Sequence, residues 1–252
     1  RMAYTDDFQG KVAARYAAND LGASSAIVFR QQDDDYSFGL AGFFADEFAA
    51  LGGETITLDY VSNTVDFSAQ INDARGFDAD VIYYSGFCAE GASLLPQLRQ
   101  QGFDQQVLGA DASDDSQCPT GGGEAFDEYL LTGFGGADVL SGDAAQRATD
   151  FAGFFNLIFP DAADFNGFTL AGADSFNVLV QAVDDADSVD PAAVLTALQN
   201  LEGYAGVSGE ITYAGTDGTP ADRTIAFFQY SVPGEDGSEW SKASLFGIGT
   251  GE

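Results

Sequence analysis

The sequence predicts an α/β fold in which a mostly parallel sheet is flanked by helices. Segments with helical apolar spacing alternate with short strand-like segments through the first half of the chain. The strand-like segments are either apolar runs or are rich in β-branched residues, and several of the helical segments end at glycine. Alternation of this kind is typical of βαβ units and therefore of parallel strands.

The first helix is expected at residues 7–21, where Gly22 ends it, and a second at 38–51, where Gly52 and Gly53 follow. Further helices are expected at 64–75, capped by Thr64 or Asp66, and at 89–102, where Pro96 is expected to produce a kink. The strands of this half are expected at 24–29, 54–61, 80–86, 106–110 and 128–134.

In the second half of the chain, helical and strand-like segments no longer alternate. Three helices follow one another at 142–159, 168–186 and 190–200, and the last has Asp190 as its cap and Pro191 as its first residue. Strands are then expected at 208–214, 224–232 and 244–250. A glycine-rich stretch near residue 135 ends the alternation, so we expect a domain break there.

The charge of the chain excludes several kinds of partner. There are 40 acidic residues against 9 basic ones, for a net charge of −31, which excludes nucleic acid and anionic membrane surfaces as partners. No run of 18 apolar residues is present, so direct membrane insertion is not expected. The acids are spread along the chain, which is typical of halophilic proteins, although a very soluble secreted protein would also show it.

The residue types also limit the chemistry. The chain has no histidine, which removes serine–histidine and cysteine–histidine catalysis and the common zinc sites. The glycine runs at 121–124 and 133–138 lack the spacing of a dinucleotide fingerprint, and no P-loop is present. We expect neither a cofactor nor a bound metal.

The two cysteines, Cys88 and Cys118, allow one disulfide or two unpaired buried thiols. We favour the disulfide, because Cys118 lies in a polar loop where a free thiol gains little from burial. In the chain-entropy model, closing a loop of this size stabilises the fold by roughly 3–4 kcal/mol. A disulfide would indicate an oxidising compartment.

Three predicted strands end near residues that suit a ligand site. Tyr36 follows the first strand, Phe87 the third and Asp111 the fourth. Ligands of open α/β sheets bind beyond the carboxyl ends of the strands, so these side chains should share one rim. Two aromatic rings and one carboxylate suit a small ligand that carries an ammonium group.

Each of these residues also has a purely structural interpretation. Asp111 could be an ordinary turn or cap residue, Tyr36 could cover the helix that it precedes, and Phe87 could belong to the core. The three aspartates at 33–35 could bind calcium, but they lack the spacing of a calcium loop, which favours a solvated loop. Convergence on one edge of the sheet favours a site.

Several stretches together resemble the type I periplasmic solute-binding proteins, specifically the leucine/isoleucine/valine-binding branch that serves ABC transporters. They are RMAYTDDFQG, DDDYSFGLAGFFADEFAALGGE, TVDFSAQINDARGFDADVIYYSG, LLPQLRQQGFDQQVLGAD and GYAGVSGEITYAGTDG. The resemblance implies two α/β lobes that close over a ligand, with the first part of lobe one missing here. Lobe two would comprise 1–134 plus 225–252, and 135–224 would be the remainder of lobe one.

The resemblance also implies roles for individual residues. Tyr36 occupies the place of a ligand-contacting tyrosine, and Asp111 that of an acid that pairs with the ligand ammonium. Phe87 occupies a place that is tyrosine in leucine-type binders, so one hydroxyl is lost. Phe168 matches an aromatic contact from lobe one, and Ser37 replaces the usual glycine after the tyrosine.

The function implied is capture of an amino acid, or of a related small amine or amide, for delivery to an ABC transporter permease. The resemblance implies a monomeric, periplasmic or extracellular protein, which a missing N-terminus could anchor to lipid, and no enzymatic activity. One alternative is a ligand-sensing domain of a receptor or regulator with the same fold. Another is a carboxylate-based hydrolase, for which Glu90 is the one candidate partner of Asp111.

Overall fold

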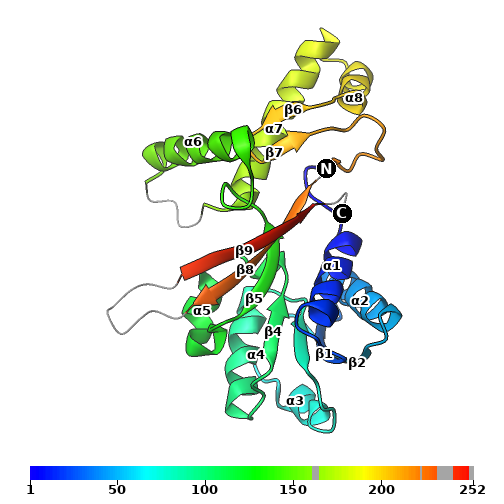
Figure 1. The fold of residues 1–252 in the computed structure, drawn as a ribbon, viewed down its shortest axis with the longest axis vertical. Helices are drawn as coiled ribbons and strands as arrows, with labels where there is room; N and C mark the ends of the chain where they lie inside the picture. Colours follow the sequence, from blue (N-terminus) through cyan, green and yellow to red (C-terminus); the bar gives the residue numbers. More distant parts are fainter. Residues whose placement is uncertain (161–164, 222, 232–240, 250–252) are drawn as a thin grey trace. The chain divides into compact units, whose positions relative to one another are not determined.

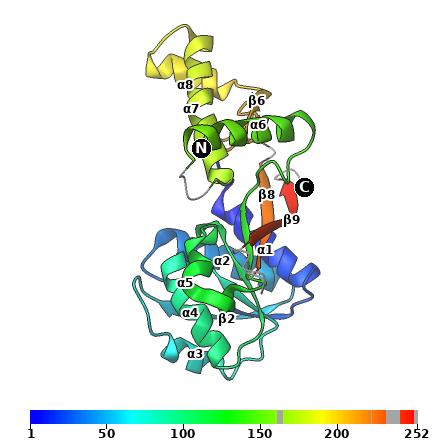
Figure 2. The same cartoon turned by 90° about the vertical axis from the view of Figure 1, so that its left-hand side faces the viewer.

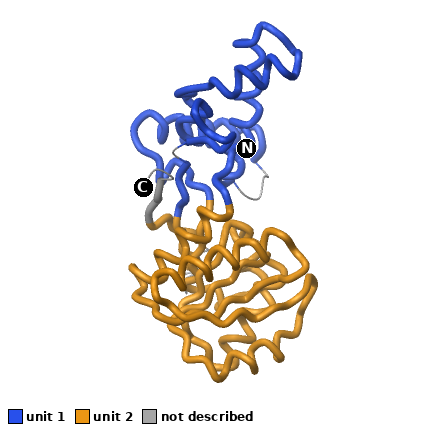
Figure 3. Tube along the Cα trace, turned by 90° about the vertical axis from the view of Figure 1, so that its right-hand side faces the viewer, with its two compact units in different colours: residues 1–5, 134–226, 246–252 blue, residues 6–133, 227–245 orange. Residues whose placement is uncertain are grey.

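The computed structural model describes residues 1–160, 165–221, 223–231 and 241–249, and the last four of these by their backbone alone. The chain forms two compact units, coloured separately in Figure 3. Unit 1 comprises Arg1–Thr5, Phe134–Ala226 and Phe246–Glu252, and unit 2 comprises Asp6–Gly133 and Phe227–Leu245.

Unit 2 is built on a seven-stranded sheet with the order β2-β1-β3-β4-β5-β8-β9 (Figure 1). The first five strands in this order pair in parallel, as the alternation of segments predicts. Strands β1, β3 and β5 are almost entirely buried, which explains their apolar sequences. The strands are β1 (Ser25–Gln31), β2 (Glu54–Tyr60), β3 (Val81–Tyr84), β4 (Gln106–Gly109), β5 (Leu130–Phe134), β8 (Thr224–Ser231) and β9 (Ser241–Gly249).

Helices cover both faces of this sheet. Helices α1 and α2 pack against each other on one face, and α3, α4 and α5 lie on the other (Figures 1 and 2). Right-handed crossovers require this arrangement when the strand order reverses at β1. The elements are α1 (Asp6–Asn19), α2 (Asp35–Ala50), α3 (Ser68–Ala74), α4 (Cys88–Gln100), α5 (Gln117–Gly122) and the 3-10 turns η1 (Asp111–Ser113) and η2 (Gly123–Phe126).

Aromatic side chains fill the core of unit 2. Phe44 of α2 stacks on Tyr83 of β3 with ring centroids 3.9 Å apart, and both side chains are inaccessible to solvent. Burial raises the pKa of the Tyr83 phenol well above its usual value. These contacts fix α2 against the sheet, and α2 carries one of the predicted site residues.

Unit 1 consists mainly of helices. They are α6 (Gly142–Ile158), α7 (Gly167–Ala186) and α8 (Pro191–Gln199), and the described residues add a small antiparallel sheet of β6 (Tyr204–Gly206) and β7 (Gly209–Ile211). Val178, Leu201 and Ile211 form a core cluster in this unit. Asp190 caps α8 by accepting hydrogen bonds from two backbone N–H groups, and Pro191 is the first residue of the helix, as predicted.

Several elements differ from the expectations. Helix α2 begins at Asp35 rather than at residue 38, because the Asp34 carboxylate accepts a hydrogen bond from the Ser37 backbone and caps the helix earlier. The strand expected at 208–214 is shorter, because β7 ends at Ile211, and it pairs with β6 in a hairpin whose turn lies at residues 207–208. The short helix α5 was not expected, since its sequence is rich in glycine and contains proline.

Neither predicted residue is the N-cap of α3, which begins at Ser68 after Phe67 and has no side-chain cap hydrogen bond. Asp66 accepts hydrogen bonds from both the backbone and the hydroxyl of Ser68, whereas the Thr64 hydroxyl donates to the Val61 carbonyl and does not cap the helix. Pro96 lies inside α4, and the kink expected there stays a prediction. Residues 232 and 250, at the ends of two predicted strands, lie outside the described residues.

The compact units divide the chain at slightly different places from the predicted lobes. Residues 1–5 group with 134–226 rather than with the larger unit. The reason is local packing: Tyr4 stacks on Phe134 with ring centroids 4.5 Å apart, and the Arg1 amino group donates to the Gly218 carbonyl. Among the described helices, none has the length and apolar character needed to span a membrane.

Candidate functional site

The three predicted rim residues all follow parallel strands of unit 2. Tyr36 lies in the first turn of α2, after β1. Phe87 immediately precedes α4, after β3, and Asp111 opens η1, after β4. Strands β1, β3 and β4 are parallel neighbours, so their carboxyl ends lie at the same edge of the sheet.

The structure brings these three side chains together. The Tyr36 hydroxyl donates to Asp111 Oδ1 at 2.5 Å. The rings of Tyr36 and Phe87 are tilted by 48° with centroids 5.8 Å apart. Phe87 is 37% exposed, so it is not a core residue. Tyr36 thus contacts both the Asp111 carboxylate and the Phe87 ring.

Two buried polar residues that the sequence analysis did not identify support Asp111. Gln9, on α1, donates from Nε2 to Asp111 Oδ1 at 2.9 Å and to the Thr132 hydroxyl at 3.0 Å. Gln9 and Thr132 are both inaccessible to solvent. The sequence signal that could have identified Gln9 is its polar amide on the otherwise apolar buried face of α1.

Two buried tyrosines donate hydrogen bonds to Ser113, in the segment that follows Asp111. The Tyr129 hydroxyl donates to the Ser113 hydroxyl at 3.0 Å, and the Tyr230 hydroxyl donates to the Ser113 carbonyl at 2.9 Å. Burial raises the pKa of both phenols, so they remain neutral donors at physiological pH. The backbone that carries Asp111 is therefore fixed by side chains of β8 and of the residue preceding β5.

The neighbouring carboxylates have structural roles. Asp33 accepts hydrogen bonds from the backbone and hydroxyl of Ser62, which hold the pKa of the Asp33 carboxyl below its usual value. Asp34 caps α2. No cluster of three metal-ligating side chains is found in the part of the chain that the structure describes. The acidic run is therefore not entirely a loop, because Asp34 is the N-cap and Asp35 the first residue of α2.

Ser37 closes the turn between β1 and α2. Its hydroxyl accepts from the Gln31 backbone at 2.9 Å and lies 3.0 Å from the Ser85 hydroxyl, and both serines are inaccessible to solvent. The Ser85 hydroxyl also donates to the Ser37 carbonyl at 3.0 Å. The serine in place of glycine therefore links the ends of β1 and β3, next to Tyr36.

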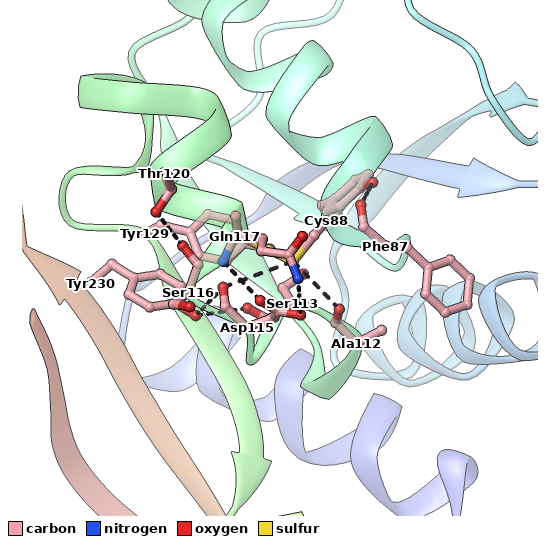
Figure 4. Close-up of a disulfide and its surroundings, with 12 residues drawn as sticks. Phe87, Cys88, Ala112, Ser113, Asp115, Ser116, Gln117, Thr120, Tyr129 and Tyr230 are labelled. Atoms are coloured by element: carbon pink, nitrogen blue, oxygen red, sulfur yellow. Dashed lines mark hydrogen bonds between the residues drawn. A yellow bond between two sulfur atoms is a disulfide. The ribbon is translucent and has the colours of Figure 1, made fainter. Parts of the chain in front are cut away.

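Cys88 and Cys118 form a disulfide with Cα atoms 4.7 Å apart (Figure 4). It joins the first residue of α4 to α5, and the Phe87 ring points away from it. A hollow of about 470 Å³ lies beside the bond and is lined by Phe87, Cys88, Ala89, Ala112, Asp115 and Gln117, among others. The disulfide thus ties the Phe87 side of the rim to the segment that follows Asp111.

Residues 1–238 match the family model described as periplasmic binding protein. The chain belongs to the periplasmic binding protein family. A leucine-binding protein, LivK, from Thermotoga maritima has the same fold, with a TM-score of 0.88 and 28% identity over 100% of this chain and 68% of its own. This match confirms the α/β fold class that the sequence predicted.

Curated relatives of this periplasmic binding protein have related names. An amino acid binding protein from Pseudomonas aeruginosa is 30% identical over 195 residues, which are 76% of this chain and 50% of the relative. A protein named Leu/Ile/Val-binding protein homolog 2, from Brucella abortus, is 28% identical over 94% of this chain and 61% of its own length. The resemblance noted from the sequence is confirmed, and the chain spans between half and about three fifths of these two relatives.

Phe168 of the periplasmic binding protein belongs to unit 1. It is 44% exposed at the start of α7, and its ring makes an edge contact with Phe134 at a centroid distance of 4.6 Å. Phe134 in turn stacks on Tyr4. The assignment of Phe168 as a ligand contact stays a prediction.

Glu90, the candidate partner of Asp111 in a hydrolase, has a structural role. It is buried in the first turn of α4, and its Oε1 accepts from the Asn63 backbone at 2.8 Å. Asn63 has a φ of 63°, in the left-handed region, and this hydrogen bond holds the turn there. Glu90 is thus used in fixing a loop, which argues against the pair of opposed carboxylates that glycoside hydrolysis requires.

Proposed function

We propose that this protein captures an amino acid, or a related small amine or amide, outside the cytoplasm and delivers it to an ABC transporter permease. The observation that carries the proposal is the partly exposed Asp111 carboxylate, which is hydrogen-bonded to Tyr36, whose ring in turn contacts Phe87. Membership of the periplasmic binding protein family and the names of the relatives support it.

The proposed role of Asp111 is to pair with the ligand ammonium. Both of its protein donors, Tyr36 and Gln9, use Oδ1. No donor among the described residues uses Oδ2, so this oxygen is available for a charge-assisted hydrogen bond with the ligand. The flanking rings add apolar contact and cation–π attraction.

On this proposal, the protein binds its ligand and catalyses no reaction. Ligand binding would stabilise one conformation over others, and no covalent step is involved. The preference for a ligand side chain would depend on Phe87, which lacks a hydroxyl, and on the adjoining hollow of about 470 Å³. We place the protein in the periplasm or at the outer cell surface, where the disulfide would persist.

Isothermal titration with the twenty amino acids and short amides tests the proposal. The complete gene product should be used, because the chain covers only part of its relatives' length. We expect saturable binding of at least one amino acid, weakened about 10- to 100-fold by Asp111→Asn, since a hydrogen bond to a charged group contributes about 1.5–3 kcal/mol.

Asp35→Asn is the matched control, because it removes the same charge one residue from Tyr36 on an exposed position of α2. Its affinity should stay within about twofold of the wild type, since an exposed charge is largely screened. If no amine-bearing ligand binds, or if both variants weaken binding equally, the proposed site is wrong.

A further inference from the structure

The two loops that carry Phe87 and Asp111 are each fixed to the sheet of unit 2 by their own hydrogen bonds. In the first loop, the hydroxyl of Tyr84 on β3 donates to the Phe87 carbonyl at 2.6 Å. In the second loop, two buried tyrosine hydroxyls donate to Ser113. These bonds hold each loop separately, so the spacing of Phe87 and Asp111 also depends on what joins the loops to each other.

The disulfide joins the two loops covalently. Cys88 immediately follows Phe87 and is the first residue of α4, whereas Cys118 belongs to α5, in the segment after Asp111. Cys88 Sγ also lies 3.9 Å from the carbonyl oxygen of Ala112, the residue next to Asp111. The bond therefore links the residue that adjoins Phe87 to the backbone that carries Asp111.

The disulfide can be reached from one side. Cys118 is inaccessible to solvent, whereas Cys88 is partly exposed and lines the hollow of about 470 Å³ together with Phe87. Exposed disulfides are more readily reduced than buried ones. A dithiol can attack Cys88 Sγ, which breaks the sulfur–sulfur bond and releases the Cys118 thiol. The second thiol of the reductant then releases the Cys88 thiol, so that two electrons and two protons pass to the protein and the reductant becomes a cyclic disulfide.

We propose that Cys88 and Cys118 are positioning residues of the candidate site, whose disulfide holds Phe87 and Asp111 at the spacing that the ligand requires, so that reduction weakens ligand binding. This inference rests on the proposed function. The effect is reciprocal, because a ligand that binds the oxidised protein more tightly makes the disulfide harder to reduce by the same factor. Couplings between sites typically change an affinity by about 5- to 150-fold.

A positioning role differs from a purely structural one. Without the bond, each loop keeps its own hydrogen bonds, but only a fraction of the folded molecules has the rim preformed, and the apparent affinity falls by that fraction. A disulfide that only opposes unfolding acts on the unfolded chain and leaves the affinity of the folded protein unchanged. The affinity of the folded protein therefore separates the two roles.

Titration of the oxidised and the dithiothreitol-reduced complete gene product with L-leucine tests the proposal. L-leucine is the probe because LivK is a leucine-binding protein. We expect reduction to raise the dissociation constant about 5- to 150-fold. L-leucine should make the potential of the disulfide more negative by about 20–65 mV, which is the same factor for a two-electron couple. The Cys88→Ser/Cys118→Ser variant is the control: it should bind like the reduced protein, and dithiothreitol should not change its affinity.

Hydrogen exchange tests the loop without any ligand, so that failure of the positioning role is distinguishable from failure of the proposed function. The backbone N–H groups of Ser113 and Asp114 donate within this segment, to the Ala110 and Asp111 carbonyls at 2.9 Å. Reduction should accelerate their exchange at least about tenfold, and low concentrations of urea should not change the rate, because local opening exposes little surface. Continued protection of β1 would show that the reduced protein is folded.

Equal affinities of the oxidised and reduced proteins for L-leucine would overturn the proposal. So would exchange at Ser113 and Asp114 that accelerates only together with exchange in β1, since this would identify a purely structural disulfide. If neither form binds L-leucine, the proposed function loses support, and the exchange result decides the positioning role. If the double serine variant does not fold, the shift in potential of the wild type still measures the coupling.

Discussion

Replacement of Asp174 by alanine should disrupt the β6–β7 hairpin of unit 1. Asp174 is 1% exposed, and it accepts hydrogen bonds from the backbone of Val207 at 2.9 Å and of Ser208 at 2.7 Å, and from the Ser208 hydroxyl at 2.6 Å. The buried Arg223 donates to the same hydroxyl at 2.9 Å. Burial lowers the pKa of the Arg223 guanidinium, and the Asp174 charge opposes that shift.

The magnitude follows from these contacts. Three hydrogen bonds to one buried carboxylate, taken near the low end of the range for charged groups, contribute about 4–5 kcal/mol. The substitution also leaves two backbone N–H groups without an acceptor and removes the nearest compensating charge from Arg223. We therefore expect Asp174→Ala to lower the free energy of unfolding of unit 1 by about 4–5 kcal/mol.

Asp190→Ala is the matched control. Asp190 also accepts two backbone hydrogen bonds in unit 1, but it is an exposed helix cap, and its loss should cost about 1 kcal/mol. Because a protein of two units need not unfold in one transition, the assay is amide hydrogen exchange in β6 and β7. Exchange should accelerate about a thousandfold in Asp174→Ala. Comparable acceleration in both variants would refute the reasoning.

Three further predictions concern unit 2. Tyr36→Phe should lower the stability by about 1.5 kcal/mol in urea denaturation, because the hydrogen bond to the charged Asp111 is lost; unchanged stability would contradict it. Reduction of the Cys88–Cys118 disulfide should lower the stability by roughly 3–4 kcal/mol, and the double serine variant should match the reduced wild type. Hydrogen bonds from the serines at the start of β1 lower the pKa of Asp80, so their stabilisation is present above a pH of about 4 and is lost as the pH falls through the lowered pKa. The loss of stability in Asp80→Asn relative to the wild type should therefore be largest at neutral pH and should shrink on acidification.

The strands and longer helices of unit 2 could be predicted because the local preference of each segment for helix or strand agrees with its burial in the fold. The buried strands are apolar throughout, and the glycines after α1 and α2 take positive φ values, 68° at Gly22 and 92° at Gly52. The end of α2 followed from this pattern, but its start did not, because the cap is one of three consecutive aspartates. Only the side-chain contact from Asp34 to the backbone distinguishes among them.

The candidate site was predictable in part. Tyr36, Phe87 and Asp111 follow strands, so the rule for ligand sites in α/β sheets locates them. Gln9 and Thr132 were not identified, because neither follows a strand end and their importance depends on a contact between residues 123 positions apart. The sequence also gave no sign that Glu90 would be used to hold a turn.

Gln9 and Tyr36 both donate hydrogen bonds to Asp111 Oδ1, and this affects which residues can change the affinity for a ligand. The carboxylate is oriented before any ligand arrives, so binding need not pay for the loss of its rotational freedom. A hydrogen bond that exists equally in the empty and occupied states contributes to the fold but cancels from the affinity. Variation at Gln9 should therefore change the stability of the protein more than its choice among ligands, whereas selectivity should evolve through the groups that contact the ligand itself, which on this proposal include the Tyr36 ring.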